Sequence, residues 1–412
     1  MHGSDRRATR TRTAIRLSAG LITAASVCLS CSEPAPPQFP DHLRAYLTEP
    51  SNPGFALYQE ASGLAERHAS ELVKRVSWTP DKRKAAIEEC ATALERIAEA
   101  QRQDVAFVFT PHSPLAPPGE RRGWRFLGRV LVWQIEGALK DRRHSDAVAT
   151  FLTAARFGAD LSGGDAMDAN IGYTIIAEAA DPLWRAFPDL PPEELRRLFR
   201  GIQEILLEMP SLETTLRHER ATMLKAVQTI QDAFLDGDLQ PFEESLGRDI
   251  GRAVRYLSRL KQEPREEQVR YFERFAAEAD QEASTLLKAA PLSPHLWTDH
   301  PEPAGERPWK RFAAHYFRTG RHLMEWWAGN QARLRLMAVD AALFARLAEG
   351  REPPGDLSGL PRLMRTDPFS GRDFIYMRRD GAYRLYSYGR DRKDDDGEGG
   401  PTGTEPDLVP WR

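Results

Sequence analysis

The stretch TPDKRKAAIEECATALERIA, residues 79–98, decides the fold class because it carries the pattern of a helix. Thr79 offers a capping hydroxyl, Pro80 takes the first helical position, and Asp81 places an acid in the first turn. Apolar residues then recur at intervals of three and four: Ile87, Cys90, Ala91, Leu94, Ile97 and Ala98. This spacing predicts one helix with a single buried stripe, in which Cys90 is an inert core thiol.

The same periodicity continues through most of the chain, and alternating strand patterns are almost absent between residues 52 and 350. Short breaks of Pro, Gly or Asp separate the helical stretches. These stretches run approximately over residues 53–76, 120–140, 145–161, 166–187, 192–209, 212–235, 242–260, 264–289, 308–328 and 330–348. The sequence therefore predicts a mainly α fold, a helical bundle or stacked helix pairs, with a helical body over residues 52–350.

Six residues in two neighbouring stretches resemble the tetratricopeptide pattern: Trp124-x-x-Leu127-Gly128 followed by Ala147-x-x-x-Phe151-x-x-Ala154. In that pattern, small residues let two antiparallel helices approach each other. No second copy follows at a fixed period, so an ordinary helical hairpin and an α-solenoid both fit the sequence.

The first thirty residues have the features of a secretory signal peptide. Residues 1–16 carry five arginines against one acid, and residues 17–30 are uncharged but too few to span a bilayer as a helix. The end of the run, Ser30-Cys31, resembles the lipobox of bacterial lipoproteins. That resemblance implies a lipid anchor on Cys31, with ordinary cleavage before Cys31 as the alternative. Residues 31–51 then form a tether, and we expect an exported protein anchored at the periplasmic face of the cell envelope.

Charge disfavours one class of partner. The full chain has 57 Lys and Arg against 60 Asp and Glu, a net charge of −3, and removal of residues 1–30 makes the remainder still more acidic. Nucleic-acid binding requires a basic excess to neutralise phosphates, so we expect no nucleic-acid partner.

Histidines suggest a possible metal site between residues 295 and 325. The candidates are His295, Asp299, His300, His315, His322 and Glu325. Their spacing matches no zinc signature, and His218-Glu219 begins such a motif but lacks its second histidine. We expect the Glu219 carboxylate to lie in water or to pair with an arginine one turn away. Nucleophile elbows, phosphate loops and dinucleotide motifs are absent from the sequence, so no catalytic residue is assigned.

Tryptophans cluster in the same part of the chain, at Trp297, Trp309, Trp326 and Trp327. Two adjacent tryptophans on a helix cannot both face one core, so Trp326 or Trp327 is a candidate for a groove or an interface. Packing between helices is the simpler interpretation.

The composition changes near residue 351, and residues 351–412 are predicted to form a hinge and a small β-hairpin cassette. Two strand-like runs, 374–377 and 383–388, flank Asp380-Gly381, which is typical of a tight hairpin turn. Residues 389–400 then concentrate carboxylates on a Gly-rich loop. Hard oxygen donors on a flexible backbone suit Ca²⁺, although the spacing is not that of an EF-hand and a solvated acidic loop is the alternative.

The tail resembles the C-terminal β-region of type II secretion major pseudopilins. The resemblance rests on Asp367-Pro368-Phe369, Gly371, Tyr376, Tyr383-x-Leu385-Tyr386-Ser387-x-Gly389-x-Asp391, Gly397-Glu398-Gly399-Gly400, Asp407 and Trp411. It implies a structural Ca²⁺ held by Asp391 and Asp407, with backbone carbonyls near Leu385 and Ser387. The prepilin leader and the long apolar N-terminal helix of that family are absent from the sequence, so the resemblance does not extend to pilus assembly.

The layout of leader, helical body and tail also resembles a group of exported bacterial lipoproteins, a resemblance that implies no activity. We therefore expect a membrane-tethered helical protein with a structural or protein-interaction role in the cell envelope, with another envelope protein as its partner. The alternative is an exported metal-dependent hydrolase with a His-rich site in residues 295–325.

Overall fold

The computed structural model describes residues 52–73, 78–111, 120–237, 257, 259–292, 294–297, 308–379, 381–400 and 407–410. The expected leader, the lipidation site Cys31 and the tether up to residue 51 lie outside the described residues. Most of the helix expected over residues 242–260 lies outside them as well.

The described part of the chain is mainly helical, as predicted. Its longer helices are α2 (Pro53–Val73), α3 (Pro80–Glu89), α4 (Ala91–Ala100), α5 (Glu120–Lys140), α6 (His144–Leu161), α7 (Ala166–Arg185), α8 (Pro192–Glu208), α9 (Leu212–Asp236), α12 (Arg265–Ala289) and α13 (Pro308–Ala348). Shorter helical segments are η2 (Phe187–Asp189), η3 (Pro294–Leu296) and α14 (Arg362–Arg365). None of the described helices is both long and apolar enough to cross a membrane.

The prediction of a single helix over residues 79–98 is wrong in one respect. The structure has two helices there, α3 and α4, which are separated at Cys90. The backbone of Cys90 has φ −91° and ψ 4°, which is outside the helical region and ends α3 before α4 begins. The buried stripe nevertheless continues across the interruption, because the buried residues Ala86, Cys90, Ala93, Ile97 and Ala100 keep intervals of four and three, while Ala91 is exposed. Thr79 caps α3 as predicted, with its hydroxyl accepting the backbone N–H of Lys82 at 3.4 Å.

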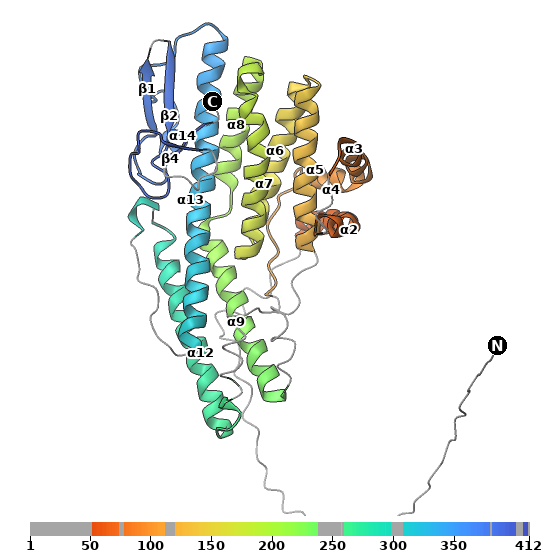
Figure 1. Ribbon diagram of the computed structural model, residues 1–412, viewed down its shortest axis with the longest axis vertical. Helices are drawn as coiled ribbons and strands as arrows, with labels where there is room; N and C mark the ends of the chain where they lie inside the picture. Colours follow the sequence, from red (N-terminus) through yellow and green to blue (C-terminus); the bar gives the residue numbers. More distant parts are fainter. Residues whose placement is uncertain are drawn as a thin grey trace, which may run out of the picture. The chain divides into compact units, whose positions relative to one another are not determined.

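The two helices expected over residues 308–328 and 330–348 form one continuous helix, α13, of 41 residues. Gly329 does not break it, because an interior glycine costs a helix only about 1 kcal/mol and packing on both sides of it exceeds that. α13 contacts α7, α8, α9 and α12, and it also contacts strand β2 of the tail (Ala382–Tyr386). Figure 1 shows this helix running alongside α12 at one end and beside the β-strands at the other.

Glycines set the closest helix crossings of the core. Gly158 of α6 and Gly172 of α7 face each other, and a Cβ atom on Gly172 would lie 2.1 Å from the carbonyl oxygen of Gly158. Helices α5 and α6 pack against each other as a helical hairpin. The sequence pattern placed Gly128 at the contact between these two helices, but it lies at another contact. A Cβ on Gly128 would lie 2.4 Å from Ile175 of α7, so this small residue permits the approach of α5 to α7.

The predicted β-hairpin is confirmed. Strand β1 (Ile375–Arg379) pairs antiparallel with β2, and Ile375 lies opposite Tyr386. Gly381 in the connecting turn has φ +78°, a left-handed conformation that glycine adopts without strain. Two short strands, β3 (Gly399–Gly400) and β4 (Asp407–Leu408), pair in parallel beside it. The cassette packs on α13, where the ring of Tyr383 lies 6.2 Å from that of Phe344.

Candidate functional site

The tail loop between residues 389 and 400 closes around Asp407. The Asp407 side chain comes from β4 and is completely buried. Its Oδ2 atom accepts the backbone N–H of Gly397 at 2.7 Å and that of Asp395 at 3.2 Å. Its Oδ1 atom is also buried, and no hydrogen-bond donor among the described residues reaches it. The Oδ2 atom of Asp407 therefore holds the loop closed, and its Oδ1 atom has no hydrogen-bond partner among the described residues.

Asp395 adds a second buried oxygen to the same place. Its Oδ2 atom is enclosed and has no hydrogen-bond partner within the described part of the chain. Burial raises the pKa of Asp407, and the nearby negative charges of Asp395 and Asp394 add to this rise. Like charges with unsatisfied oxygens favour the uptake of a cation, because a cation supplies the missing partner and removes the repulsion.

The other predicted ligand, Asp391, does not lie inside the loop with Asp407. It is exposed, and its Oδ1 atom accepts the backbone N–H of Lys393 at 3.1 Å in a local turn. Asp394 is likewise engaged, because its Oδ1 accepts the hydroxyl of Tyr386 at 2.9 Å. Asp407 is thus the member of the predicted pair that points into the loop, and Asp395 is the residue that sequence reasoning missed.

Backbone carbonyls would have to complete an ion site in this loop. No three His, Cys, Asp or Glu side chains among the described residues are gathered closely enough to hold a metal ion by themselves. Ca²⁺ accepts mixed sets of carboxylate and carbonyl oxygens. Of the two predicted carbonyl regions, Ser387 lies next to β4, where its backbone N–H donates to the carbonyl of Leu408 at 3.0 Å.

The loop is attached to the helical body through two arginines. Arg392 donates to the carbonyl of Trp297 at 3.0 Å, and Arg390 forms an ion pair with Glu325 of α13. The ring of Trp297 in turn packs 6.3 Å from that of Trp327. A change in the fold of the loop would therefore be transmitted to α13 and to the segment that ends at Trp297.

The histidine candidates are only partly described. His295 packs its ring against Gly371 of the tail. His322 lies on the surface, stacked on Trp326 and 3.4 Å from Glu325. Asp299, His300 and the side chain of His315 lie outside the described residues, so the predicted cluster is not assembled in what the structure describes.

The two adjacent tryptophans differ as expected. Trp327 is partly buried and packs against the main core, whereas Trp326 is 42% exposed. The side chain of Trp309 lies outside the described residues. Packing explains Trp327, and Trp326 remains the candidate for a groove or an interface.

A buried charge cluster at the start of α7 is a feature that the sequence did not predict. The Arg121 guanidinium of α5 contacts Asp168 at 2.6 Å and Asp165 at 2.7 Å. Asp165 caps α7, and its side chain accepts the backbone N–H of Asp168 in a capping box. Glu219 of α9 accepts the backbone N–H of Ala166 at 3.0 Å, at the first turn of the same helix. Three carboxylates and one guanidinium therefore meet at one helix N-terminus.

Two of these carboxylates have raised pKa values. Burial is the main cause, and it raises the pKa of Asp168 to about 7 and that of Glu219 to about 8, with the charge of Asp165 adding to both. The expectation that Glu219 lies in water or pairs with an arginine one turn away is wrong, because α9 packs against the start of α7. The Asp165–Asp168 spacing was a visible capping signal, but nothing in the sequence linked it to Arg121 or Glu219.

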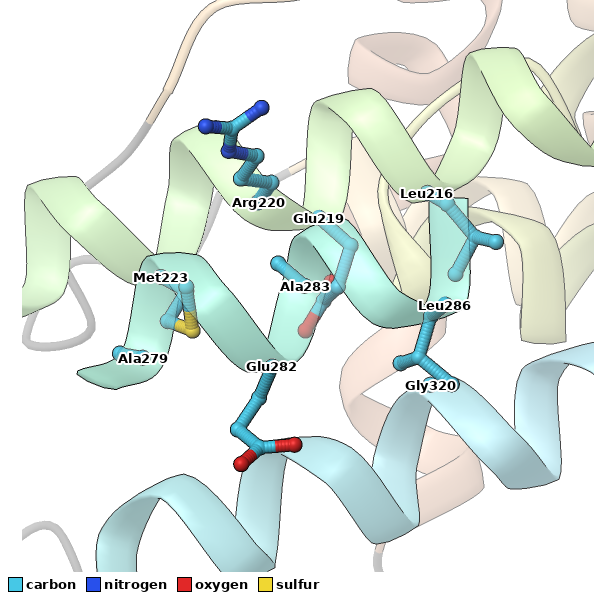
Figure 2. Close-up of a pocket in the computed structure, with 9 residues that line it drawn as sticks. All are labelled: Leu216, Glu219, Arg220, Met223, Ala279, Glu282, Ala283, Leu286 and Gly320. Carbon is cyan, nitrogen blue, oxygen red and sulfur yellow. The ribbon is translucent and has the colours of Figure 1, made fainter. Parts of the chain in front are cut away.

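A narrow cleft lies beside this cluster, between α9, α12 and α13 (Figure 2). Its cavity volume is about 20 Å³, which is room for about one water molecule. Glu219 and Glu282 border it together with apolar residues such as Met223 and Leu286, and Arg220 at its edge pairs with Asp280 at 2.6 Å. Glu219 thus belongs both to the buried cluster and to the wall of the cleft.

Comparison with protein-family models, with characterised proteins and with solved structures finds no match for this chain. The fold and the sites therefore define a mainly helical protein with a small β cassette, and function must be argued from the residues themselves.

Proposed function

We propose that this chain is an exported, lipid-anchored helical protein with a structural or protein-interaction role in the cell envelope, and that its tail cassette folds around Ca²⁺. Residues 1–30 would direct export, and Cys31 would carry the lipid. The helical body would present the cassette to an envelope protein partner. The cassette would be the regulated part of this surface, because its loop is joined to the body through Arg390 and Arg392.

The observation that carries the calcium proposal is the Asp407 carboxylate, which is completely buried with one oxygen unpartnered. A buried carboxylate without a counter-charge destabilises a fold, because desolvation favours its neutral form. A cation bound by Asp407 and Asp395 would remove this penalty and tie the loop to β4. Asp391 would act from the outer side of the loop, where its present turn with Lys393 would have to open.

Calcium titration of the full secreted chain tests the proposal. We expect added Ca²⁺ to raise the melting temperature of the wild-type protein and to bind with a measurable heat. Asp407→Asn should abolish both effects, since the amide removes the charge but keeps a similar shape. Asp373→Asn is the matched control, because Asp373 is an exposed tail carboxylate that pairs with Arg365. An equal rise in the Asp407→Asn protein would refute the ion site.

Metal analysis separates this proposal from the hydrolase alternative. Stoichiometric zinc that is lost on replacement of His295 and His322 would favour the alternative. Calcium that is lost on replacement of Asp407 would favour the proposal.

The lipid anchor has its own test. Cys31→Ser should move the protein from the membrane fraction to the soluble fraction and abolish incorporation of labelled fatty acid. Unchanged fractionation of the Cys31→Ser protein would contradict the anchor and favour ordinary cleavage.

A further inference from the structure

A second cleft on the helical body shares no lining residue with the cleft beside Glu219 or with the calcium loop. Residues of α5, α7 and α13 line it, and α7 contacts both of the other helices. Its cavity volume is about 500 Å³. Pockets of roughly 300 to 1,000 Å³ are typical of small-molecule sites. The second cleft is therefore large enough to hold a ligand.

Part of the lining of this cleft is apolar. Val132 of α5 and Ala180 and Trp184 of α7 line it and are buried, and Ala177 is partly buried beside them. The indole N–H of Trp184 donates to Asp340, which fixes the orientation of the ring. Because alanine has a short side chain, Ala177 and Ala180 leave space that an apolar group of a ligand can occupy.

An ion pair in the lining uses only one atom of each partner. Nη2 of Arg129 donates to Oε1 of Glu178 at 2.9 Å. The other carboxylate oxygen, Oε2, makes no hydrogen bond with the described residues, and neither do Nε and Nη1 of Arg129. Arginine–carboxylate pairs are frequently bidentate. This pair therefore keeps unused guanidinium donors and an unused carboxylate acceptor close to each other.

Two further acceptors belong to residues of the same lining. Glu136 of α5 accepts Arg83 through Oε2, and its Oε1 has no partner in the described part of the chain. Pro182 lies inside α7. Since proline has no N–H, it cannot donate to the carbonyl of Glu178 four residues earlier, so this carbonyl lacks its helical hydrogen bond.

The other charged residues of the lining are not needed for ligand recognition. Arg185 contacts Asp181 one turn away, at 2.7 Å from its Oδ2. Arg333 borders the cleft from α13 and is buried. Recognition of a ligand is therefore assigned to Arg129, Glu178 and Glu136.

We propose that this cleft binds a small zwitterion, an α-amino acid with an apolar side chain. An α-amino acid carries an ammonium and a carboxylate on the same carbon atom, as close together as the unused atoms of Arg129 and Glu178. Its carboxylate accepts from Arg129, and its ammonium, which has three N–H donors, binds the carboxylates of Glu178 and Glu136. Its side chain packs against Val132 and Ala177. The site gives the helical body a ligand of its own, separate from the calcium loop.

Calorimetric titration of the full chain with L-leucine tests this site. We expect saturable binding of one molecule per chain. N-acetyl-L-leucine lacks the ammonium and L-leucinamide lacks the carboxylate, and each should bind at least about tenfold more weakly. These comparisons use the wild-type protein and depend on no variant. Absence of binding up to about 10 mM L-leucine, or equal binding of the three compounds, would overturn the proposal.

Two variants assign the contacts. Glu178→Gln should weaken the binding of L-leucine about tenfold or more and that of N-acetyl-L-leucine no further, because the latter has no ammonium to lose. Arg129→Gln should likewise weaken L-leucine but not L-leucinamide. Glu99→Gln is the matched control, since Glu99 pairs with Arg96 on α4 and does not line the cleft. Wild-type affinity for L-leucine in Glu178→Gln would overturn the site.

A third variant tests the apolar part of the cleft. Ala177→Leu fills the space beside Val132 and leaves the charged groups in place. It should abolish the binding of L-leucine while the far-ultraviolet circular dichroism stays that of the wild type. Undiminished binding in a folded Ala177→Leu protein would show that the ligand lies elsewhere and would also overturn the proposal.

Discussion

The hydroxyl of Tyr383 donates a 2.8 Å hydrogen bond to Oδ1 of Asp340, and this bond fastens the β cassette to the C-terminal part of the long helix α13. The other carboxylate oxygen of Asp340 accepts the indole N–H of Trp184 of α7 at 2.7 Å. One buried aspartate therefore joins three parts of the fold that are far apart in the sequence.

Removing the Tyr383 hydroxyl should destabilise the protein. We expect Tyr383→Phe to lower the free energy of unfolding by about 1.5 to 3 kcal/mol, because it leaves one oxygen of a buried carboxylate without this donor. Tyr388→Phe is a suitable control, since the Tyr388 hydroxyl makes no hydrogen bond within the described residues. Urea denaturation checks the difference, and equal stability of the two variants would contradict this role of Tyr383.

The crossing of α6 and α7 should not tolerate a side chain. A Cβ on Gly172 would lie 2.1 Å from a backbone oxygen of α6, so Gly172→Ala should destabilise the fold by about 3 kcal/mol or prevent folding. Gly137 of α5 has open space around it. Gly137→Ala should instead stabilise the protein by up to about 1 kcal/mol through helix propensity. We expect the melting temperature to fall in Gly172→Ala and to rise in Gly137→Ala. An unchanged melting temperature in Gly172→Ala would refute the close crossing of α6 and α7.

The buried carboxylate of Asp160 makes the stability of the protein depend on pH. Burial raises the pKa of Asp160 to about 7, although the hydroxyl of Tyr58 donates to it at 2.7 Å. The contribution of Asp160 to stability should therefore decline as the pH rises from about 4 to about 7.

Unfolding by urea at both ends of this range measures the decline. We expect Asp160→Asn to remove about 2 to 4 kcal/mol of the pH dependence, since each pKa unit corresponds to about 1.4 kcal/mol. Asp146→Asn on the same helix should remove none, because Asp146 is exposed and pairs with Arg143. If the free energy of unfolding of Asp160→Asn depended on pH as strongly as that of the wild type, the raised pKa of Asp160 would be refuted.

Local periodicity predicted the helices well because each amphipathic stretch repeats its apolar residues on one face, and most expected bounds agree with the structure to within two residues. The exceptions have tertiary causes. Gly329 carries no strong stop signal once α13 is held at both ends, and the backbone of Cys90 turns where α3 gives way to α4. Single-residue conformations of this kind are not encoded in a hydrophobic pattern.

The candidate sites were predicted less completely than the fold. The hairpin and the acidic loop were visible because Asp380-Gly381 and the glycines around residue 397 are local signals. The partner of Asp407 within the loop, Asp395, depends on how the loop closes. The association of Arg121 with Glu219 joins residues almost one hundred positions apart, and only the packing of α9 against α7 brings them together.

Helix α13 has a mechanical consequence. It is a single rod of 41 residues, about 60 Å long at 1.5 Å per residue, that contacts both α12 and the β cassette. No loop interrupts it to absorb a rotation, so a tilt of α13 against α12 is converted into a displacement of the hairpin at its far end. The spacing between α12 and the β cassette is accordingly set by the rise of the helix.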